Sequence, residues 1–199
     1  NTLVVGAPGD RNRGADTGAA YVFTRQGSAW SQQAKLTASN GASAGRFGTS
    51  VAVGGSVVLI GRPGATTGSD ANEGAYFFRQ SGSFWTEEFA ASGGGDFGRS
   101  VAIAGIQAVV GAPAAESGRG VVTVYRDSSG WGQETTLTAS DRQTGERFGD
   151  AVAMARVPNG LQLEYQVVVG APNWDNPTRT GVDHGRAFVF QKSGTAWTL

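Results

Sequence analysis

The sequence predicts an all-β fold made of repeated four-stranded antiparallel sheets, and three recurring markers are the basis for this prediction. The first marker is a Phe-Gly pair, which begins at Phe47, Phe97 and Phe148. The second is a Gly-Ala-Pro or Gly-Arg-Pro motif after an apolar segment, which begins at Gly6, Gly61, Gly111 and Gly170. The third is a tryptophan after a Ser/Gly turn, found at Trp30, Trp85, Trp131 and Trp197. Because the markers keep their order at a period of about 50 residues, they indicate an internal repeat.

Each period contains four short segments with the composition of strands. In the second unit these are residues 49–53, 57–61, 75–79 and 85–90, and tight hairpin turns join the first pair and the last pair. Four antiparallel strands per repeat form a β-propeller blade, so we predict a single propeller segment over residues 1–199. Its units are expected at about residues 1–39, 40–91, 92–140 and 141–199. No helix is predicted.

The two terminal units decide how the predicted blades can close. The first unit opens at its second strand and the last ends where its fourth strand begins, which gives about fifteen strands, or a little under four blades. Propeller rings usually close with roughly 4 to 8 blades. One possibility is a four-bladed ring, permuted so that the two chain ends share a blade. We favour the other, a partial ring completed by further blades or a second chain, because the strand that a closed ring would lack is an inner one.

Packing explains the residue types of the markers. Neighbouring blades cover both faces of each other, so segments such as VVLIG and VVVGAP can be apolar almost throughout. We expect the phenylalanine of the Phe-Gly pair to fill the wedge between blades, while glycine lets two backbones approach closely. Proline ends strand pairing because it has no N–H to donate. The markers are therefore predicted to be core residues without a catalytic role.

The order of these motifs resembles that of the FG-GAP repeat, which builds the propellers of integrin α-subunits and of many bacterial surface proteins. The resemblance rests on the Phe-Gly pair, Gly-Ala-Pro, a strand such as GAAYVF and a turn such as GSAW, and it covers essentially the whole chain. Residues 32–39 (QQAKLTAS) and 134–140 (ETTLTAS) look most like the bacterial form. The resemblance implies an integrin-like propeller that is extracellular or on the cell surface.

The composition argues against several classes of function. The chain has 16 basic and 16 acidic residues, so its formal net charge is zero and no strong field attracts nucleic acid or an anionic membrane. No apolar segment approaches the roughly 18 residues needed to cross a bilayer, so membrane insertion is not expected. Cysteine is absent, which removes disulfides, thiolate zinc sites and cysteine nucleophiles.

The longest and most varied connections are expected on one rim of the blades. Because strand direction alternates, the connections between second and third strands lie on the same rim as those between blades, opposite the hairpin turns. These connections are residues 9–17, 40–46, 64–73, 114–119, 141–147 and 173–185. Variable loops on a rigid scaffold often carry binding sites, so this rim is the candidate binding surface.

The most distinctive of these connections spans residues 173–185. Its candidate ligand-binding residues are Trp174, Asp175, Asn176, Asp183 and His184. An exposed aromatic ring beside carboxylates suits a sugar or a peptide. The alternative is that Trp174 folds back over the rim and that the acidic side chains are only solvated. A histidine metal cluster is excluded within one chain, since there is a single histidine.

Integrin-like repeats carry an Asp/Asn-rich calcium loop between the first and second strands of several blades. Here those connections, at residues 54–56, 104–105 and 155–164, lack the spaced oxygen ligands that calcium requires. A weaker candidate for a calcium site is the group Asp10, Asn12 and Asp16, although the neighbouring arginines argue against metal binding there. We therefore expect no metal and no cofactor, and keep these three residues as candidates for ligand binding.

No enzymatic motif is evident in the sequence. There is no Gly-x-Ser-x-Gly nucleophile motif between a strand and a helix, and the glycine-rich segment 92–98 lacks the lysine of a phosphate-binding loop. Glu87 and Glu88 are expected on opposite faces of one strand, where they cannot act together. Catalysis by this chain is therefore not expected.

These observations predict a non-catalytic extracellular recognition or adhesion module that presents the loops of one rim to a protein or a glycan. Two alternatives stay open. Open sheet edges invite strand addition, which would make the chain a structural unit that joins other chains or self-associates. The chain could also be the accessory propeller of a larger secreted hydrolase.

Overall fold

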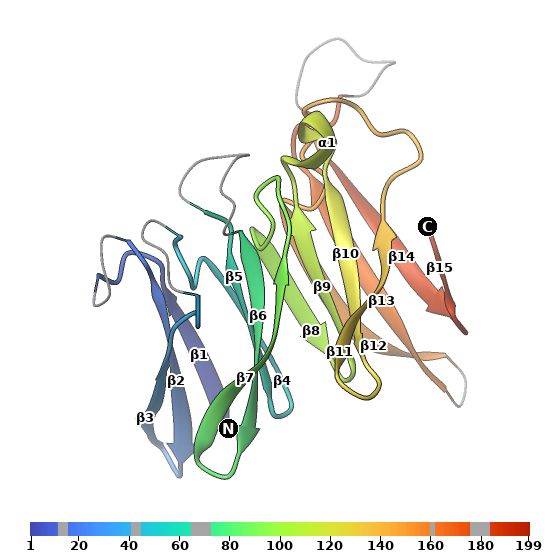
Figure 1. Ribbon diagram of the computed structural model, residues 1–199. Coiled ribbons are helices and arrows are strands. Elements are labelled where there is room, and N and C mark those ends of the chain that lie inside the picture. The colour runs from blue at the N-terminus through green and yellow to red at the C-terminus, as the bar shows by residue number, and fades with distance from the viewer. Residues whose placement is uncertain (12–15, 41–44, 65–72, 160–161, 176–183) are drawn as a thin grey trace.

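The computed structural model describes residues 1–11, 16–40, 45–64, 73–159, 162–175 and 184–199. These residues form four antiparallel sheets, each built from strands that are consecutive in the sequence (Figure 1). The first sheet contains β1 (Thr2–Ala7), β2 (Ala19–Gln26) and β3 (Ala29–Leu36). The second contains β4 (Ser50–Gly54), β5 (Val57–Arg62), β6 (Gly74–Ser81) and β7 (Phe84–Ser92). The third contains β8 (Ser100–Ala104), β9 (Gln107–Ala112), β10 (Val121–Asp127) and β11 (Trp131–Leu137). The fourth contains β12 (Ala151–Asn159), β13 (Gln162–Ala171), β14 (Arg186–Ser193) and β15 (Ala196–Thr198).

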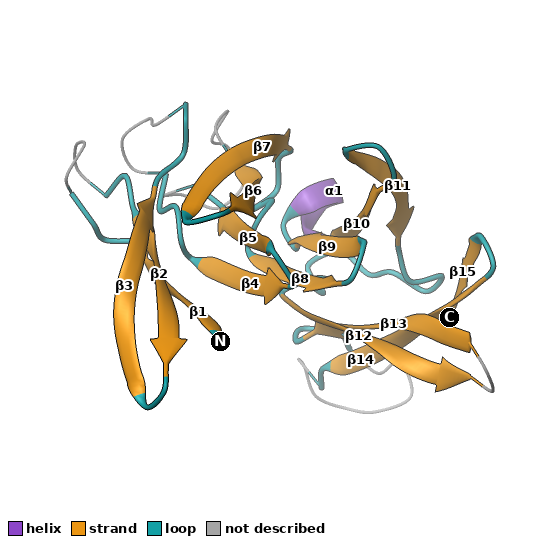
Figure 2. Cartoon of the chain, turned by 90° about the horizontal axis from the view of Figure 1, so that it is seen from below, coloured by secondary structure: helices purple, strands orange, loops and turns teal. Residues whose placement is uncertain are grey.

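The all-β prediction of repeated antiparallel blades is confirmed by this architecture. The sheets follow one another along an open arc, with β4, β8 and β12 side by side at its inner edge (Figure 2). The first and fourth sheets lie at opposite ends of the arc in both views (Figures 1 and 2). The chain therefore forms a partial ring, and not a four-bladed ring whose two ends share one blade.

An apolar cluster fills each junction between neighbouring sheets in the described chain. Phe47 lies in the cluster between the first and second sheets, Phe97 in the next and Phe148 in the last. The Phe47 ring meets the rings of Tyr76 and Phe78 edge-on, at centroid distances of 5.3 and 6.2 Å. The prediction that these phenylalanines fill the wedge between blades is confirmed.

The two glycine motifs contact each other across each junction. The N–H of Gly98 donates to the carbonyl oxygen of Gly111 in its own unit, at 3.0 Å. The carbonyl oxygen of Gly98 faces the preceding sheet, where a Cβ added to Gly61 would lie only 2.0 Å from it. The other two junctions repeat this close approach. The glycine of Gly-Ala-Pro in one sheet thus contacts the backbone of the Phe-Gly pair in the next unit. A side chain on the Gly-Ala-Pro glycine would prevent this contact.

The tryptophan marker joins the outer strands of neighbouring sheets. In three cases the indole N–H donates to a side chain on the outer strand of the preceding sheet: Trp85 to Gln33 (3.0 Å), Trp131 to Glu88 (2.8 Å) and Trp197 to Glu134 (3.4 Å). Trp30 belongs to the first sheet and is 47% exposed. The marker tryptophan therefore forms a hydrogen bond between two blades wherever a preceding sheet is present.

Glu87 and Glu88 point to different neighbours, as expected for adjacent strand residues. The Glu87 carboxylate accepts hydrogen bonds from the backbone N–H and hydroxyl of Ser39 in the preceding unit, at 3.1 and 2.6 Å. Glu88 accepts from Trp131 in the following sheet. The two carboxylates serve separate junctions.

Two details of the sequence-based prediction are wrong. A four-residue turn, α1 (Ala115–Gly118), lies between β9 and β10, where no helix was expected. Glu116 and Ser117 have φ angles of 51° and 63°, so this is a tight turn and not a regular helix.

The second error concerns the connection predicted over residues 155–164. Most of that segment is strand, since β12 continues to Asn159 and β13 begins at Gln162. Ala155 pairs with Gln166, and the pairing extends through Pro158. The proline is tolerated because β12 is an edge strand, where the missing N–H breaks no ladder bond in the sheet interior.

Candidate functional site

We call the edge that carries the connections between second and third strands, and those between sheets, the loop edge. Backbone hydrogen bonds join these connections across junctions. The N–H of Arg46 donates to the carbonyl oxygen of Asp16 (3.1 Å), and that of Arg147 donates to Gly118 (2.8 Å). The prediction that both kinds of connection share one rim is confirmed. The opposite edge, with its tight turns within each sheet, is called the hairpin edge.

Asp10 is held within the first sheet. Its carboxylate accepts hydrogen bonds from Nζ of Lys35 at 2.9 and 3.0 Å and from the hydroxyl of Tyr21 at 2.7 Å. The bond to Asp10 raises the pKa of Lys35, against the lowering effect of desolvation. The carboxylate thus fastens the connection after β1 to β2 and β3. Asn12, which was predicted beside it, lies outside the described residues.

Asp16 borders an open cavity at the junction of the first two units. The cavity has a volume of about 320 Å³ and is lined by Pro8, Gly9, Asp16 and Arg46. The side chain of Asp16 is 48% exposed and lies 3.4 Å from the guanidinium of Arg11. Asp16 and Arg46 have φ angles of 51° and 56°, which is uncommon for residues other than glycine. Their backbones are held there by the hydrogen bond between the two connections.

Trp174 packs against the core of the junction between the third and fourth sheets. It is partly buried, and the guanidinium of Arg186 lies 5.0 Å from its ring and 4.5 Å from the ring of Phe188. The indole nitrogen is buried and makes no hydrogen bond among the described residues. Of the two interpretations of Trp174, the structure corresponds to the second, in which the ring folds back over the rim.

Asp175 and His184 come together beside Trp174. Nδ1 of His184 lies 3.9 Å from the carboxylate of Asp175, whose side chain is 47% exposed. The backbone of Asp175 is fixed by the side chain of Gln143, which accepts from its N–H (3.2 Å) and donates to its carbonyl oxygen (3.0 Å). The remaining candidates of this group, Asn176 and Asp183, lie outside the described residues.

Glu146 is a residue of the loop edge that the sequence analysis missed. It is fully buried, and its carboxylate accepts a hydrogen bond from the N–H of Gln143 at 2.9 Å. Burial raises the pKa of Glu146, while that hydrogen bond acts in the opposite direction. The corresponding positions of the second and third units are Gly45 and Gly95. A charged residue at a position that is otherwise glycine was the signal that could have revealed it.

Among the described residues, no group of three or more His, Asp or Glu side chains is placed to hold a metal ion. In that part of the chain, no helix has the length and apolar character of a membrane span.

Sheets of this kind, joined side by side through paired glycine motifs and wedged phenylalanines, define a β-propeller-type repeat module. The family model described as FG-GAP repeat matches residues 30–78 and 131–190, which is more than half of the chain. The chain belongs to the FG-GAP repeat family. Such repeats are typical of integrin-like β-propeller modules and are typically extracellular. A comparison with curated proteins found no match.

Each matched stretch begins at a marker tryptophan and ends on the third strand of the next sheet. The first runs from Trp30 on β3 to Phe78 on β6, and the second from Trp131 on β11 to Phe190 on β14. The family repeat therefore spans a junction between two sheets. It includes the tryptophan of one sheet and the Phe-Gly and Gly-Ala-Pro motifs of the next.

Proposed function

We propose that the chain is a non-catalytic extracellular recognition module that binds a protein or a glycan at its loop edge. The observation that carries this proposal is the open cavity of about 320 Å³ beside Asp16 and Arg46. It is lined by Asp16, whose side chain is 48% exposed, and by the exposed Arg46, and a carboxylate and a guanidinium suit a polar ligand. The sheets beneath supply a packed scaffold for the described residues that line it.

Binding to glycan and peptide arrays, followed by titration of the best probe, tests this proposal. An Arg46→Asn variant is expected to weaken binding at least about tenfold, because asparagine keeps the left-handed backbone and removes the guanidinium. The matched control is Arg25→Asn, which removes an exposed arginine at the hairpin edge. The proposal would be contradicted if no probe binds, or if Arg46→Asn and Arg25→Asn lose affinity equally. Trp174→Ala is unsuitable as the main test, since it also removes core packing.

A second candidate function, assembly through the two end faces of the arc, is favoured by apolar side chains exposed there. Leu3 and Val5 on the first sheet are each 45% exposed, whereas the corresponding Val58 and Ile60 of the second sheet are fully buried. At the other end, Val168 and Val189 are 42% and 51% exposed. Their counterparts in the second sheet, Leu59 and Phe77, are fully buried against the third sheet.

Gly170 lies on the fourth sheet, beside the same exposed face. In the preceding sheets the glycine of Gly-Ala-Pro touches the next sheet, and a Cβ there would lie 1.9 to 2.1 Å from a carbonyl oxygen. At Gly170 the nearest atom would be 3.7 Å away, so nothing in the described chain requires glycine. We propose that a second copy occupies this face, with its first sheet on the fourth sheet of its partner. Each junction within the chain likewise packs the second and third strands of one sheet against those of the next.

The molar mass in solution, measured by light scattering, tests the assembly. The wild type is expected to exceed the 20.4 kDa of one chain, and Val168→Asp is expected to return it to that value. A buried carboxylate without a partner strongly disfavours an apolar interface. Phe84→Asp, at a 77% exposed apolar position of the hairpin edge, serves as the control and should leave the mass unchanged. A wild type that is monomeric at all concentrations would exclude this assembly.

A further inference from the structure

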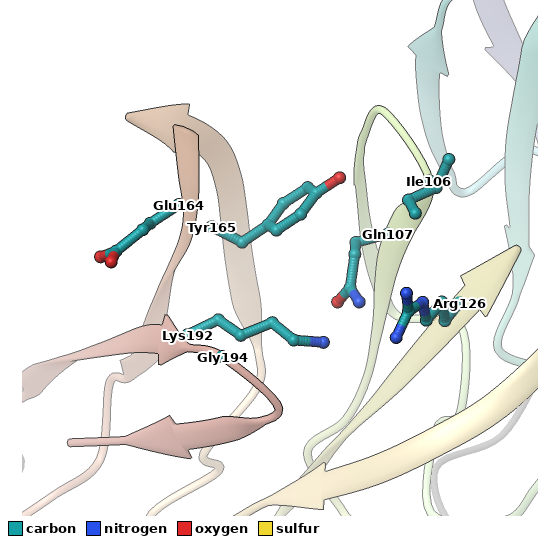
Figure 3. Close-up of a pocket in the computed structure, with 7 residues that line it drawn as sticks. All are labelled: Ile106, Gln107, Arg126, Glu164, Tyr165, Lys192 and Gly194. Atoms are coloured by element: carbon teal, nitrogen blue, oxygen red, sulfur yellow. The ribbon is translucent and has the colours of Figure 1, made fainter. Parts of the chain in front are cut away.

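A polar cleft lies at the hairpin edge between the third and fourth sheets (Figure 3). It has a volume of about 190 Å³, and its lining includes Gln107 and Arg126 from the third sheet and Tyr165 and Lys192 from the fourth. This is below the roughly 300–1,000 Å³ typical of sites for drug-sized ligands, so it has room for one small ring. The cleft is separate from the loop edge and from the candidate residues there.

Gln107, in the wall of this cleft, has a buried acceptor that is unsatisfied among the described residues. Its side chain is only 1% exposed, and Nε2 donates to the carboxylate of Glu134 at 2.9 Å. That bond fixes the orientation of the amide, because the reversed amide would place its oxygen against a carboxylate oxygen. Oε1 is buried and has no hydrogen-bond partner among the described residues. A buried acceptor is unfavourable without a donor, so a ligand hydroxyl would satisfy it.

The charges around the cleft favour an anionic group. In Figure 3 the Lys192 and Arg126 side chains extend toward the same space, whereas the carboxylate of Glu164 points away from it. Lys192 donates to Glu134, and Nη1 of Arg126 lies 3.7 Å from the same carboxylate. Two cations thus share the carboxylate of Glu134, which can neutralise only one of their two charges. A guanidinium is the cation best suited to bind a carboxylate through two parallel hydrogen bonds.

We propose that this cleft binds a small acidic sugar, such as a uronic acid unit. Its carboxylate lies on Arg126, and one of its hydroxyls donates to Oε1 of Gln107. The ring of Tyr165 and the 45% exposed side chain of Ile106 border the same space and contact the apolar face of the sugar. This site is additional to the loop edge and does not depend on the function proposed for it.

A matched pair of probes tests the proposal, since glucuronate and glucose differ only in the carboxylate. Titrated into the wild type and followed by protein NMR, glucuronate is expected to bind at least about tenfold more tightly than glucose. Chemical-shift changes are expected at residues of the cleft and not at the loop edge. Equal affinities for the two sugars, or no binding of glucuronate at about 10 mM, would overturn the proposal.

Two variants separate the two contacts. Arg126→Met should abolish the preference for glucuronate, and Arg25→Met, at an exposed arginine of the same edge, should leave it intact. Gln107→Met should weaken the binding of both sugars to a similar degree. Gln107 also bonds Glu134, so the melting temperature of that variant is measured first. If the preference survives in Arg126→Met, the assignment of the carboxylate is wrong.

Discussion

A Gly111→Ala variant is expected to lose about 3 kcal/mol or more of its free energy of unfolding. The added Cβ would lie 2.1 Å from the carbonyl oxygen of Gly149 and 2.4 Å from Oγ of Ser100. The first contact is with backbone of the next sheet, so no side chain can rotate to relieve it. For a chain of this length, such a loss corresponds to a melting temperature lower by about 6–12 °C, which calorimetry or circular dichroism would measure.

Gly170→Ala is the matched control, because it makes the same substitution at the same position of the repeat. The nearest atom to its Cβ would be the Cβ of Ala151 at 3.7 Å, an ordinary contact. We expect its free energy of unfolding to change by no more than about 0.5 kcal/mol, measured on dilute, monomeric protein. Similar losses in the two variants would show that the contact between the glycine motifs is not what constrains Gly111.

Lys192→Met is expected to lower the free energy of unfolding at pH 7 by about 3 kcal/mol, the low end for breaking a buried ion pair. Lys192 on β14 is 7% exposed and donates to Glu134 on β11, so the pair joins the third and fourth sheets. Methionine keeps most of the volume and leaves the carboxylate of Glu134 with Gln107, Trp197 and a distant guanidinium as its partners among the described residues.

The pH dependence distinguishes this loss from a packing defect. Burial alone would raise the pKa of Glu134, but the hydrogen bonds from Lys192 and Gln107 outweigh it and lower the pKa below the ordinary value. A carboxyl with a lowered pKa stabilises the fold above its unfolded-state pKa of about 4.3, and this stabilisation is lost as the pH falls through the folded-state value. The difference between wild type and Lys192→Met should therefore be large at pH 7 and shrink in acid.

Urea denaturation at a series of pH values measures that difference. Arg11→Met is the control, since Arg11 forms an exposed ion pair with Asp16 that is worth at most about 1 kcal/mol. A deficit in Lys192→Met that stays constant down to low pH would mean that the loss comes from packing and not from the ion pair.

The repeat in the sequence was sufficient to predict the sheets and the residues that join them. Phe47, Phe97 and Phe148 recur at a fixed spacing, and a residue type that recurs in this way must serve the same contact in each unit. The loop edge followed from strand alternation alone. The errors were local: α1 is one tight turn in the connection between β9 and β10, and the long β12–β13 hairpin departs from the short hairpins before it.

The candidate site was less predictable, because its geometry depends on residues that the repeat does not relate. Trp174 and Arg186 face each other only after β13 and β14 pair, and no spacing in the sequence indicates that the ring turns toward the core. The cleft beside Gln107 likewise requires two sheets to meet before its polar side chains face each other.

The sequence by itself determined the strands, their order within each sheet and the markers at each junction, because these depend on local periodicity and on the sizes of single residues. The sequence favoured a partial ring, and the tertiary structure decided between it and the closed ring. The tertiary structure alone decided that Asp10 binds Lys35 and that Val168 is exposed while Leu59 is buried. The physical reason is that burial and charge pairing depend on which sheet covers a given face. Identical positions of a repeat can therefore have opposite environments.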